Sequence, residues 1–211
     1  MKNVIIDFIY PVIQSIKDKI EIKKQVRKHN AWQKSGCLVP PPHLVKQKVI
    51  KEYQQMYGYT ILIETGTFKG DMIKAQLSNF DQLISIELGV ELHRKAVRRF
   101  KNIKNVNIVQ GDSGKVLPKI LLDINEPAIF WLDGHYSAGK TAKGDKECPI
   151  FDELNAIFNG KKLNHILLID DARLFIGEND YPTIKELTAF IKIKNDKYKI
   201  EVKDDIIKIA V

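Results

Sequence analysis

The 211-residue sequence has little cysteine, no internal repeat and no long uninterrupted apolar run. Its two cysteines, Cys37 and Cys148, lack the spacing of a disulfide framework or a metal site, which favours a reducing, cytoplasmic location. Apolar residues make up 44% and charged residues 28%, which excludes a disordered chain, a collagen-like chain and a polytopic membrane protein. The net charge of +8 favours acidic partners such as nucleic acid, anionic lipid or a phosphorylated or carboxylated substrate, although a solvated lysine-rich surface also explains it.

The N-terminal part combines an apolar stripe with a basic run. Apolar residues recur at helical spacing from Val4 to Ile20, and lysines and one arginine gather between Lys17 and Lys28. The stripe is too short to span a bilayer, and no small-residue cleavage site follows it. Such a helix either packs on its own domain or on a second subunit of a homodimer, or lies peripherally on an anionic inner membrane face. The three prolines of Gly36–Pro42 break any helix, so we expect a helical extension over residues 1–43 and one domain over residues 44–211.

Beyond residue 43, short apolar runs alternate with amphipathic segments. The predicted strands are Tyr59–Glu64, Leu83–Glu87, Val106–Val109, Ala128–Leu132 and Ile166–Ile169. The predicted helices are Leu44–Tyr57, Asp71–Leu77, Glu91–Phe100, Gly114–Leu122, Pro149–Phe158 and Thr183–Ile193. Two further strands, Tyr198–Lys203 and Ile206–Val211, are separated by two residues and must therefore pair antiparallel. The sequence thus predicts an α/β fold: a Rossmann-like, doubly wound, mostly parallel seven-stranded sheet with an antiparallel C-terminal hairpin.

Acidic residues follow all five of the predicted parallel strands. Because the carboxyl ends of such strands line one crevice, where ligands bind in doubly wound sheets, we expect these side chains to share a ligand site. They are Glu64, Glu87, Asp112, Asp133, Asp170 and Asp171.

The loop Glu64–Gly70 follows the first strand and opens a helix. Gly66 allows close approach of the backbone to a ligand, and Gly70 permits tight packing of the helix on a strand. The loop has neither the full glycine fingerprint of dinucleotide-binding proteins nor the G-K-[ST] of a phosphate loop. Glu87 lies 21 residues after Gly66, the spacing at which an acid accepts the hydroxyls of a ribose. Together these features predict a cofactor that contains a nucleoside.

Residues 44–211 resemble the class I S-adenosylmethionine-dependent methyltransferases. The resemblance rests on Glu64-x-Gly66, Glu87, Gly111-Asp112-Ser113, Asp133 and the C-terminal hairpin. It implies that the first loop passes under the methionine part of S-adenosylmethionine (SAM), that Glu87 binds the ribose, and that Asp112 and Ser113 flank the adenine. The cofactor-binding residues implied in this way are Glu64, Gly66, Thr67, Gly70, Glu87, Leu88, Asp112, Ser113 and Asp133.

Asp133, Asp170 and Asp171 resemble the metal ligands of metal-dependent O-methyltransferases, both the macrocin-type sugar enzymes and the catechol type. Three clustered carboxylates repel one another unless a cation neutralises them, and oxygen ligands suit Mg²⁺, or else Ca²⁺ or Mn²⁺. Alternatively, Asp170 or Asp171 only caps the turn that follows.

Candidate catalytic and substrate residues follow the fourth and fifth strands. Asp133 and His135, two residues apart, are the candidate catalytic residues, because the ordinary pKa of an imidazole suits a general base. Tyr136 and Arg173 are candidate substrate contacts. The lysine-bearing segment Tyr136–Cys148 has the composition of a lid that attracts an anionic acceptor.

The sequence therefore predicts an enzyme that carries out metal-assisted O-methylation of a sugar, a glycan or a related small molecule. An RNA methyltransferase and a non-catalytic cofactor-binding scaffold remain as alternatives. Nucleic acid is the less favoured partner, because no appended RNA-binding module is recognisable in the sequence.

Overall fold

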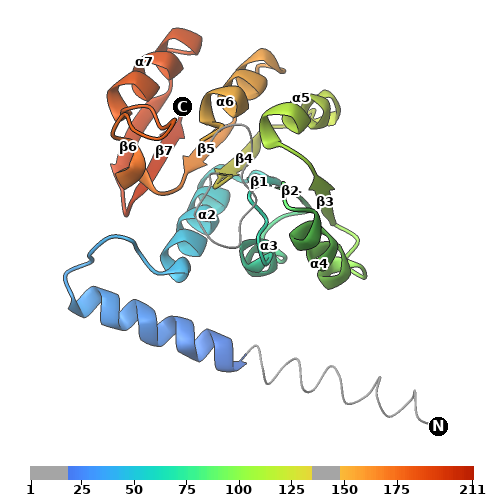
Figure 1. Ribbon diagram of the computed structural model, residues 1–211, viewed down its shortest axis with the longest axis vertical. Coiled ribbons are helices and arrows are strands. Elements are labelled where there is room, and N and C mark those ends of the chain that lie inside the picture. The colour runs from blue at the N-terminus through green and yellow to red at the C-terminus, as the bar shows by residue number, and fades with distance from the viewer. Residues whose placement is uncertain (1–18, 135–147) are drawn as a thin grey trace.

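A seven-stranded sheet forms the centre of the computed structural model, which describes residues 19–134 and 148–211 (Figure 1). The strand order is β3-β2-β1-β4-β5-β7-β6. The strands are β1 (Ile61–Thr65), β2 (Gln82–Glu87), β3 (Val106–Gln110), β4 (Ala128–Leu132), β5 (Ile166–Ile169), β6 (Lys199–Lys203) and β7 (Ile206–Ala210). The order reverses between β1 and β4, and this makes their carboxyl ends the switch point of the sheet.

The pairing confirms the predicted mixed sheet. β1 pairs in parallel with β2 and β4, β2 with β3, and β4 with β5. β7 runs antiparallel to both β5 and β6. The two-residue turn of this hairpin, Asp204 and Asp205, has φ values of 55° and 60°, as a tight hairpin turn requires.

Helices cover both faces of the sheet. One face carries α2 (His43–Tyr57), α3 (Asp71–Gln76) and α4 (Val90–Phe100), and the other carries α5 (Ser113–Asp123), α6 (Ile150–Asn159) and α7 (Ile184–Lys194) (Figure 1). Two apolar clusters fill the spaces between the layers. Because both faces are covered, every residue of β1, β4 and β5 is buried, which is typical of central parallel strands.

The predicted elements agree with the structure to within about two residues, and β4 and β5 have the predicted bounds. Thr183 caps α7 and forms a reciprocal capping box with Glu186, which explains the sharp start of that helix. The sequence did not predict the short 3₁₀ helix η1 (Ala172–Leu174) directly after β5. This helix is only three residues long and has no apolar periodicity.

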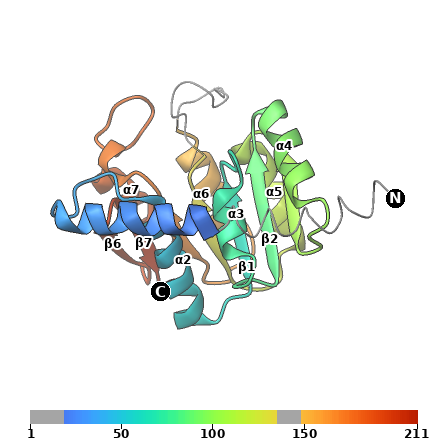
Figure 2. The ribbon, with the colours of Figure 1, turned by 90° about the horizontal axis from the view of Figure 1, so that it is seen from below.

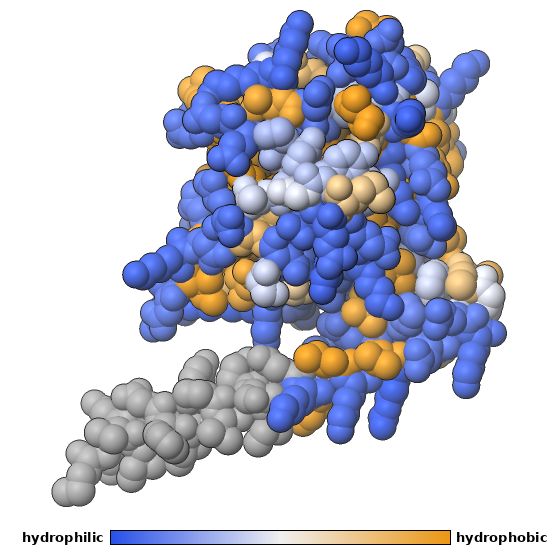
Figure 3. All heavy atoms as spheres, turned by 180° about the vertical axis from the view of Figure 1, so that it is seen from behind, coloured by the Kyte–Doolittle hydropathy of each residue, from blue (hydrophilic) through white to orange (hydrophobic). Residues whose placement is uncertain are grey.

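Residues 19–34 form a helix that crosses the side of the molecule carrying α2 and α3 (Figure 2). It is joined to α2 by a 3.4 Å contact between His29 Nε2 and Lys48 Nζ. Ile20 and Ile22 are 61% and 60% exposed, and Figure 3 shows hydrophobic and hydrophilic side chains side by side on its surface. Among the described residues, 19–134 and 148–211, no helix combines the length and apolar character needed to cross a bilayer. The division into an extension and a domain stays a prediction.

Candidate active site

The loops after β1 and β4 meet directly at the switch point. Gly66 has a φ of 86°, and a Cβ there would press on the carbonyl oxygen of Asp133 and lie 2.9 Å from its carbonyl carbon. The backbone N–H of Asp133 donates to the carbonyl oxygen of Thr65 at 3.2 Å. Gly66 is therefore required by the contact between two loops, a role that the sequence did not reveal.

Glu64, at the end of β1, is a buried carboxyl group held by hydroxyl groups. The Ser85 hydroxyl on β2 donates to Glu64 Oε2, and the hydroxyl oxygens of Ser85 and Thr67 are 2.6 Å apart. Burial raises the pKa of Glu64 to about 8, and the hydrogen bond from Ser85 only partly opposes this rise. Near neutral pH this carboxyl group is therefore largely protonated.

Glu87, at the end of β2, ties the first two loops together. Its Oε2 accepts the backbone N–H of Phe68 at 2.7 Å, and its Oε1 accepts that of Gly89 at 2.8 Å. Burial raises the pKa of Glu87, and these two backbone hydrogen bonds work against that rise. The neighbouring Leu88 accepts a hydrogen bond from Gln110 Nε2 at its carbonyl oxygen, 3.1 Å away. Glu87 thus lies at the predicted edge, with both oxygens already bonded to backbone.

The remaining predicted cofactor residues also have structural roles. Asp112 caps α5 by accepting the backbone N–H of Gly114 at 3.0 Å. The buried Ser113 hydroxyl donates to Glu153 Oε1 at 2.5 Å. Gly70 lies where a Cβ would be 2.6 Å from the ring of Phe100 on α4, so its close neighbour is a helix and not, as predicted, a strand. Whether these residues bind a cofactor stays a prediction.

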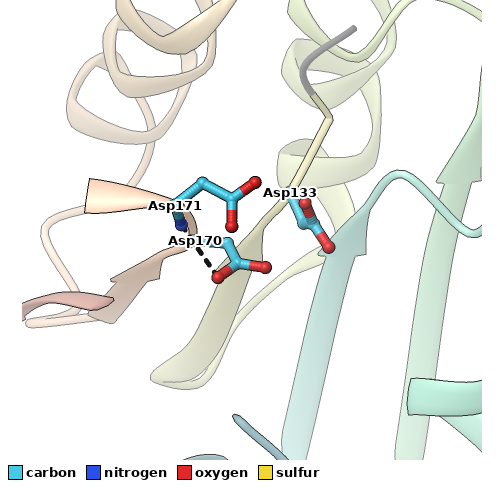
Figure 4. A group of neighbouring side chains, drawn as sticks. All are labelled: Asp133, Asp170 and Asp171. Carbon is cyan, nitrogen blue, oxygen red and sulfur yellow. Dashed lines mark hydrogen bonds between the residues drawn. The ribbon is translucent and has the colours of Figure 1, made fainter. Parts of the chain in front are cut away.

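Three aspartates gather beyond the ends of β4 and β5 (Figure 4). One carboxylate oxygen each from Asp133, Asp170 and Asp171 lies within 4.8 Å of the others. Asp170 Oδ1 accepts the backbone N–H of Asp171 at 2.8 Å, and Asp171 adopts a left-handed φ of 54° just before η1. The Asp171 side chain makes no capping hydrogen bond to η1. The donor set consists of carboxylate oxygens, a ligand type that suits Mg²⁺.

Two basic side chains among the described residues contact this cluster. Lys46 Nζ on α2 contacts Asp170 Oδ2 directly and lies 3.4 Å from Asp171 Oδ1. Burial raises the pKa of Asp170, and the charge of Lys46 opposes the rise. For Lys46, burial alone would lower the pKa, but Asp170 together with Asp171 and Asp133 raises it. Lys46 therefore stays charged.

Arg173, the predicted substrate contact, binds carboxylates of the protein itself. Its Nη1 donates to Asp171 Oδ1 at 2.8 Å and to Asp205 Oδ2, and its backbone N–H donates to Asp205 Oδ1 at 2.8 Å. The sequence missed both Lys46 and Asp205. Little in the sequence indicated that these two residues belong to the site. Lys46 lies one helical turn before the buried Ile50, and Asp205 is one of two adjacent aspartates in a hairpin turn.

His135, Tyr136 and most of the predicted lid lie outside the described residues. Cys148, which is described, is buried and immediately precedes Pro149, the N-cap residue of α6. Burial raises the pKa of its thiol to about 12, which agrees with a structural residue and not with a nucleophile.

Comparison with known proteins identifies similar folds. No family model matches the sequence, and no curated protein matches it. TomG, an O-methyltransferase of Streptomyces achromogenes solved with SAM, gives a TM-score of 0.58 at 14% identity, covering 89% of this chain and 88% of that one. An O-methyltransferase of Bacillus cereus solved with S-adenosylhomocysteine (SAH) gives 0.57 at 12%, covering 90% of each chain. A Staphylococcus aureus protein provisionally assigned as a caffeoyl-CoA O-methyltransferase gives 0.57 at 12%, covering 93% of this chain and all of that one. At these identities the comparisons establish the fold.

Proposed function

We propose that the protein is a SAM-dependent O-methyltransferase that acts, with Mg²⁺, on a hydroxyl group of a small molecule. The observation that carries this proposal is the cluster of Asp133, Asp170 and Asp171 at the switch point of a sheet, in a fold similar to that of solved O-methyltransferases. In the reaction, the bond between the sulfonium sulfur and the methyl group breaks as the bond to the acceptor oxygen forms. The products are SAH, a methyl ether and one proton.

The cofactor would lie across the ends of β1, β2 and β3. Glu64 and the loop with Gly66, Thr67 and Gly70 would face its methionine part. Glu87 and Leu88 would face the ribose, and Asp112 and Ser113 the adenine. Support comes from the buried carboxyl groups of Glu64 and Glu87. They accept hydrogen bonds from a hydroxyl group and from backbone N–H groups, and within the described residues neither forms an ion pair with a basic side chain. SAM carries a sulfonium and an ammonium group, so a buried acid near it gains a positive partner.

Asp133, Asp170 and Asp171 would hold the metal. When bound, Mg²⁺ acts as a Lewis acid that lowers the pKa of the acceptor hydroxyl. His135, two residues after Asp133, would take the proton, and Tyr136 and Arg173 would orient the acceptor. For Arg173 the support is its ion pair with Asp171, which keeps the guanidinium beside the cluster.

We further propose that the acceptor is a sugar, a glycan or a related hydroxylated molecule, with an anionic group favoured. The sequence supports this with Lys140, Lys143 and Lys146 in the segment after β4. Catechol-type acceptors are included in the test because one structural neighbour is provisionally assigned as a caffeoyl-CoA O-methyltransferase.

The test is transfer of labelled methyl from SAM to panels of neutral sugars, uronic acids, phosphosugars, catechols and RNA, with Mg²⁺ and with a chelator. We expect a labelled small-molecule product that depends on Mg²⁺. Methylation of RNA alone would instead support the alternative enzyme class. SAM binding without any transfer would support a cofactor-binding scaffold.

For the helix of residues 19–34 we propose contact with an anionic membrane surface. It carries six basic residues and one acidic residue beside the exposed Ile20 and Ile22. Sedimentation with anionic and neutral vesicles at low and high salt tests this proposal. Binding to anionic vesicles that weakens with salt is expected, and binding to neither kind would contradict it.

A further inference from the structure

Lys46 lies where a cation would bind the aspartate cluster. Its ammonium contacts Asp170 Oδ2 and lies 3.4 Å from Asp171 Oδ1. The negative charge of Asp133 also stabilises the charged form of Lys46. The side chain of Lys46 is 15% exposed, and that of Asp170 is 1% exposed. This is a partly buried ion pair between α2 and the end of β5, formed by residues 124 positions apart in the chain.

We infer that the Lys46 ammonium is the resident cation of the aspartate cluster, and that a divalent metal ion binds there by displacing it. The inference rests on the metal site of the proposed function. It goes further by assigning to Lys46 a role in setting the affinity and exchange of the metal.

The hydrogen bonds of Asp170 explain why the two cations compete. Its Oδ1 is held by the backbone N–H of Asp171, and its Oδ2 is the oxygen that Lys46 contacts. A metal ion that uses Asp170 therefore shares this carboxylate with the ammonium, and at Oδ2 it would meet the ammonium at the same oxygen. Two positive charges at one carboxylate repel each other, so occupancy by one disfavours the other.

The position of Lys46 on α2 makes this exchange feasible without unfolding. Val49 and Ile50, one turn further along the helix, are 3% and 0% exposed and anchor α2 against the sheet. Lysine has a flexible four-carbon stem, so its ammonium can swing away while the helix stays packed. Arg173 differs, because Asp205 holds it from two sides in addition to its ion pair with Asp171. Lys46 is therefore the basic side chain that an incoming metal ion displaces.

The experiment measures Mn²⁺ affinity by electron paramagnetic resonance at one fixed pH, with neither SAM nor an acceptor present. The variants are Lys46→Met, Lys46→Gln and the control Lys51→Met. Lys51 is an exposed lysine on the same helix, so its loss changes the net charge equally without touching the cluster. We expect both Lys46 variants to bind Mn²⁺ about ten-fold or more tighter than the wild type, and Lys51→Met to stay within about two-fold of it.

Folding is checked with and without Mn²⁺ by circular dichroism. A Lys46→Met protein that folds only with Mn²⁺ would support the inference, because the metal then supplies the charge that the ammonium supplied. Lys46→Gln keeps an N–H donor for Asp170, so this variant should stay folded even if Lys46→Met does not. Misfolding of both Lys46 variants even with Mn²⁺ would contradict the inference, since the metal would then fail to replace the ammonium.

Two outcomes separate this inference from the proposed function. If the wild type binds Mn²⁺ and the Lys46 variants bind it no more tightly than Lys51→Met does, only the role of Lys46 is wrong. If none of the proteins binds Mn²⁺, both the displacement and the metal site are wrong, while SAM titration still tests the cofactor site.

Discussion

The carboxyl ends of the parallel strands form one edge of the sheet, with the ends of β1 and β2 on one half and those of β4 and β5 on the other. Both halves bury acidic side chains, but they pair these side chains differently. On the β1–β2 half, Glu64 and Glu87 accept hydrogen bonds from neutral donors, the Ser85 hydroxyl and two backbone N–H groups. On the β4–β5 half, Asp170 and Asp171 form ion pairs with Lys46 and Arg173. The first arrangement leaves positive charge to be supplied by a ligand, which suits the sulfonium and ammonium groups of SAM. The second already holds cations, so an incoming metal ion must exchange with one of them.

The largest effect is expected from removing a carboxylate on the β4–β5 half. Asp133→Asn and Asp171→Asn should each lower Mg²⁺-dependent turnover on the order of 100-fold or more, because the proposed metal site loses the carboxylate of one of its three aspartates. SAM affinity should stay within about two-fold, because the cofactor residues lie mainly on the other half. Turnover and calorimetric SAM binding are measured on the same samples.

The control is Asp123→Asn, at the exposed end of α5, which should match the wild type in both measurements. Unchanged turnover in Asp133→Asn and Asp171→Asn would exclude the metal mechanism.

The next effect concerns the pH dependence of stability on the β1–β2 half. Because the folded-state pKa of Glu64 is about 8 against an ordinary 4.5, the native protein keeps a proton that the unfolded chain releases between these values. The free energy of unfolding should therefore fall as pH rises from about 4.5 to 8, by on the order of 4 kcal/mol from this group.

Glu64→Gln cannot ionise, so it should lack this part of the pH dependence. Urea unfolding of the wild type and Glu64→Gln at pH 5, 6.5 and 8.5 measures the difference. Equal dependence on pH in both proteins would show that Glu64 is ionised in the folded state near neutral pH.

The contact between the two halves depends on Gly66. Gly66→Ala should lower the free energy of unfolding by about 2–4 kcal/mol, because its Cβ would press on the backbone of Asp133. The matched control is Gly58→Ala, at a φ of 69° with open space around the added Cβ, which should cost only about 1 kcal/mol from backbone strain. Equal losses in the two variants would mean that the loops after β1 and β4 are not in tight contact.

The smallest effect is expected at Glu87. Glu87→Gln should weaken SAM binding about ten-fold, because a neutral amide is a poorer acceptor for ribose hydroxyls than a carboxylate. Its Mn²⁺ affinity should equal that of the wild type. A loss of Mn²⁺ binding in this variant, with SAM binding intact, would reverse the assignment of the two halves.

The sequence predicted where acids gather at the carboxyl ends of the strands, but it did not predict every side chain that pairs with them. Strand periodicity located the acids, and parallel topology brought Asp133 to Asp170 and Asp171 as predicted. Lys46 was missed because it lies 124 residues from Asp170 and reads as an ordinary lysine on an amphipathic helix. Such ion pairs depend on how α2 packs on the sheet, which local sequence patterns do not encode.

The roles of individual residues were also hard to foresee. The contact of Arg173 with substrate stays a prediction, and the structure adds its ion pairs with Asp171 and Asp205, of which Asp205 was visible in the sequence only as part of a turn. The approach of Gly66 to a ligand also stays a prediction, and the structure adds its close contact with the backbone of Asp133. Residue type and spacing predict where polar groups gather, whereas the pairing among them follows from the tertiary packing.

The central claim is that the β1–β2 half binds SAM independently of the cation on the β4–β5 half. Calorimetric titration of the wild-type protein with SAM, once with Mg²⁺ and once with a chelator, tests it most directly. Saturable binding of one SAM per chain under both conditions is the predicted result. Binding only with Mg²⁺ would contradict this independence, and absence of binding under both conditions would contradict the methyltransferase assignment.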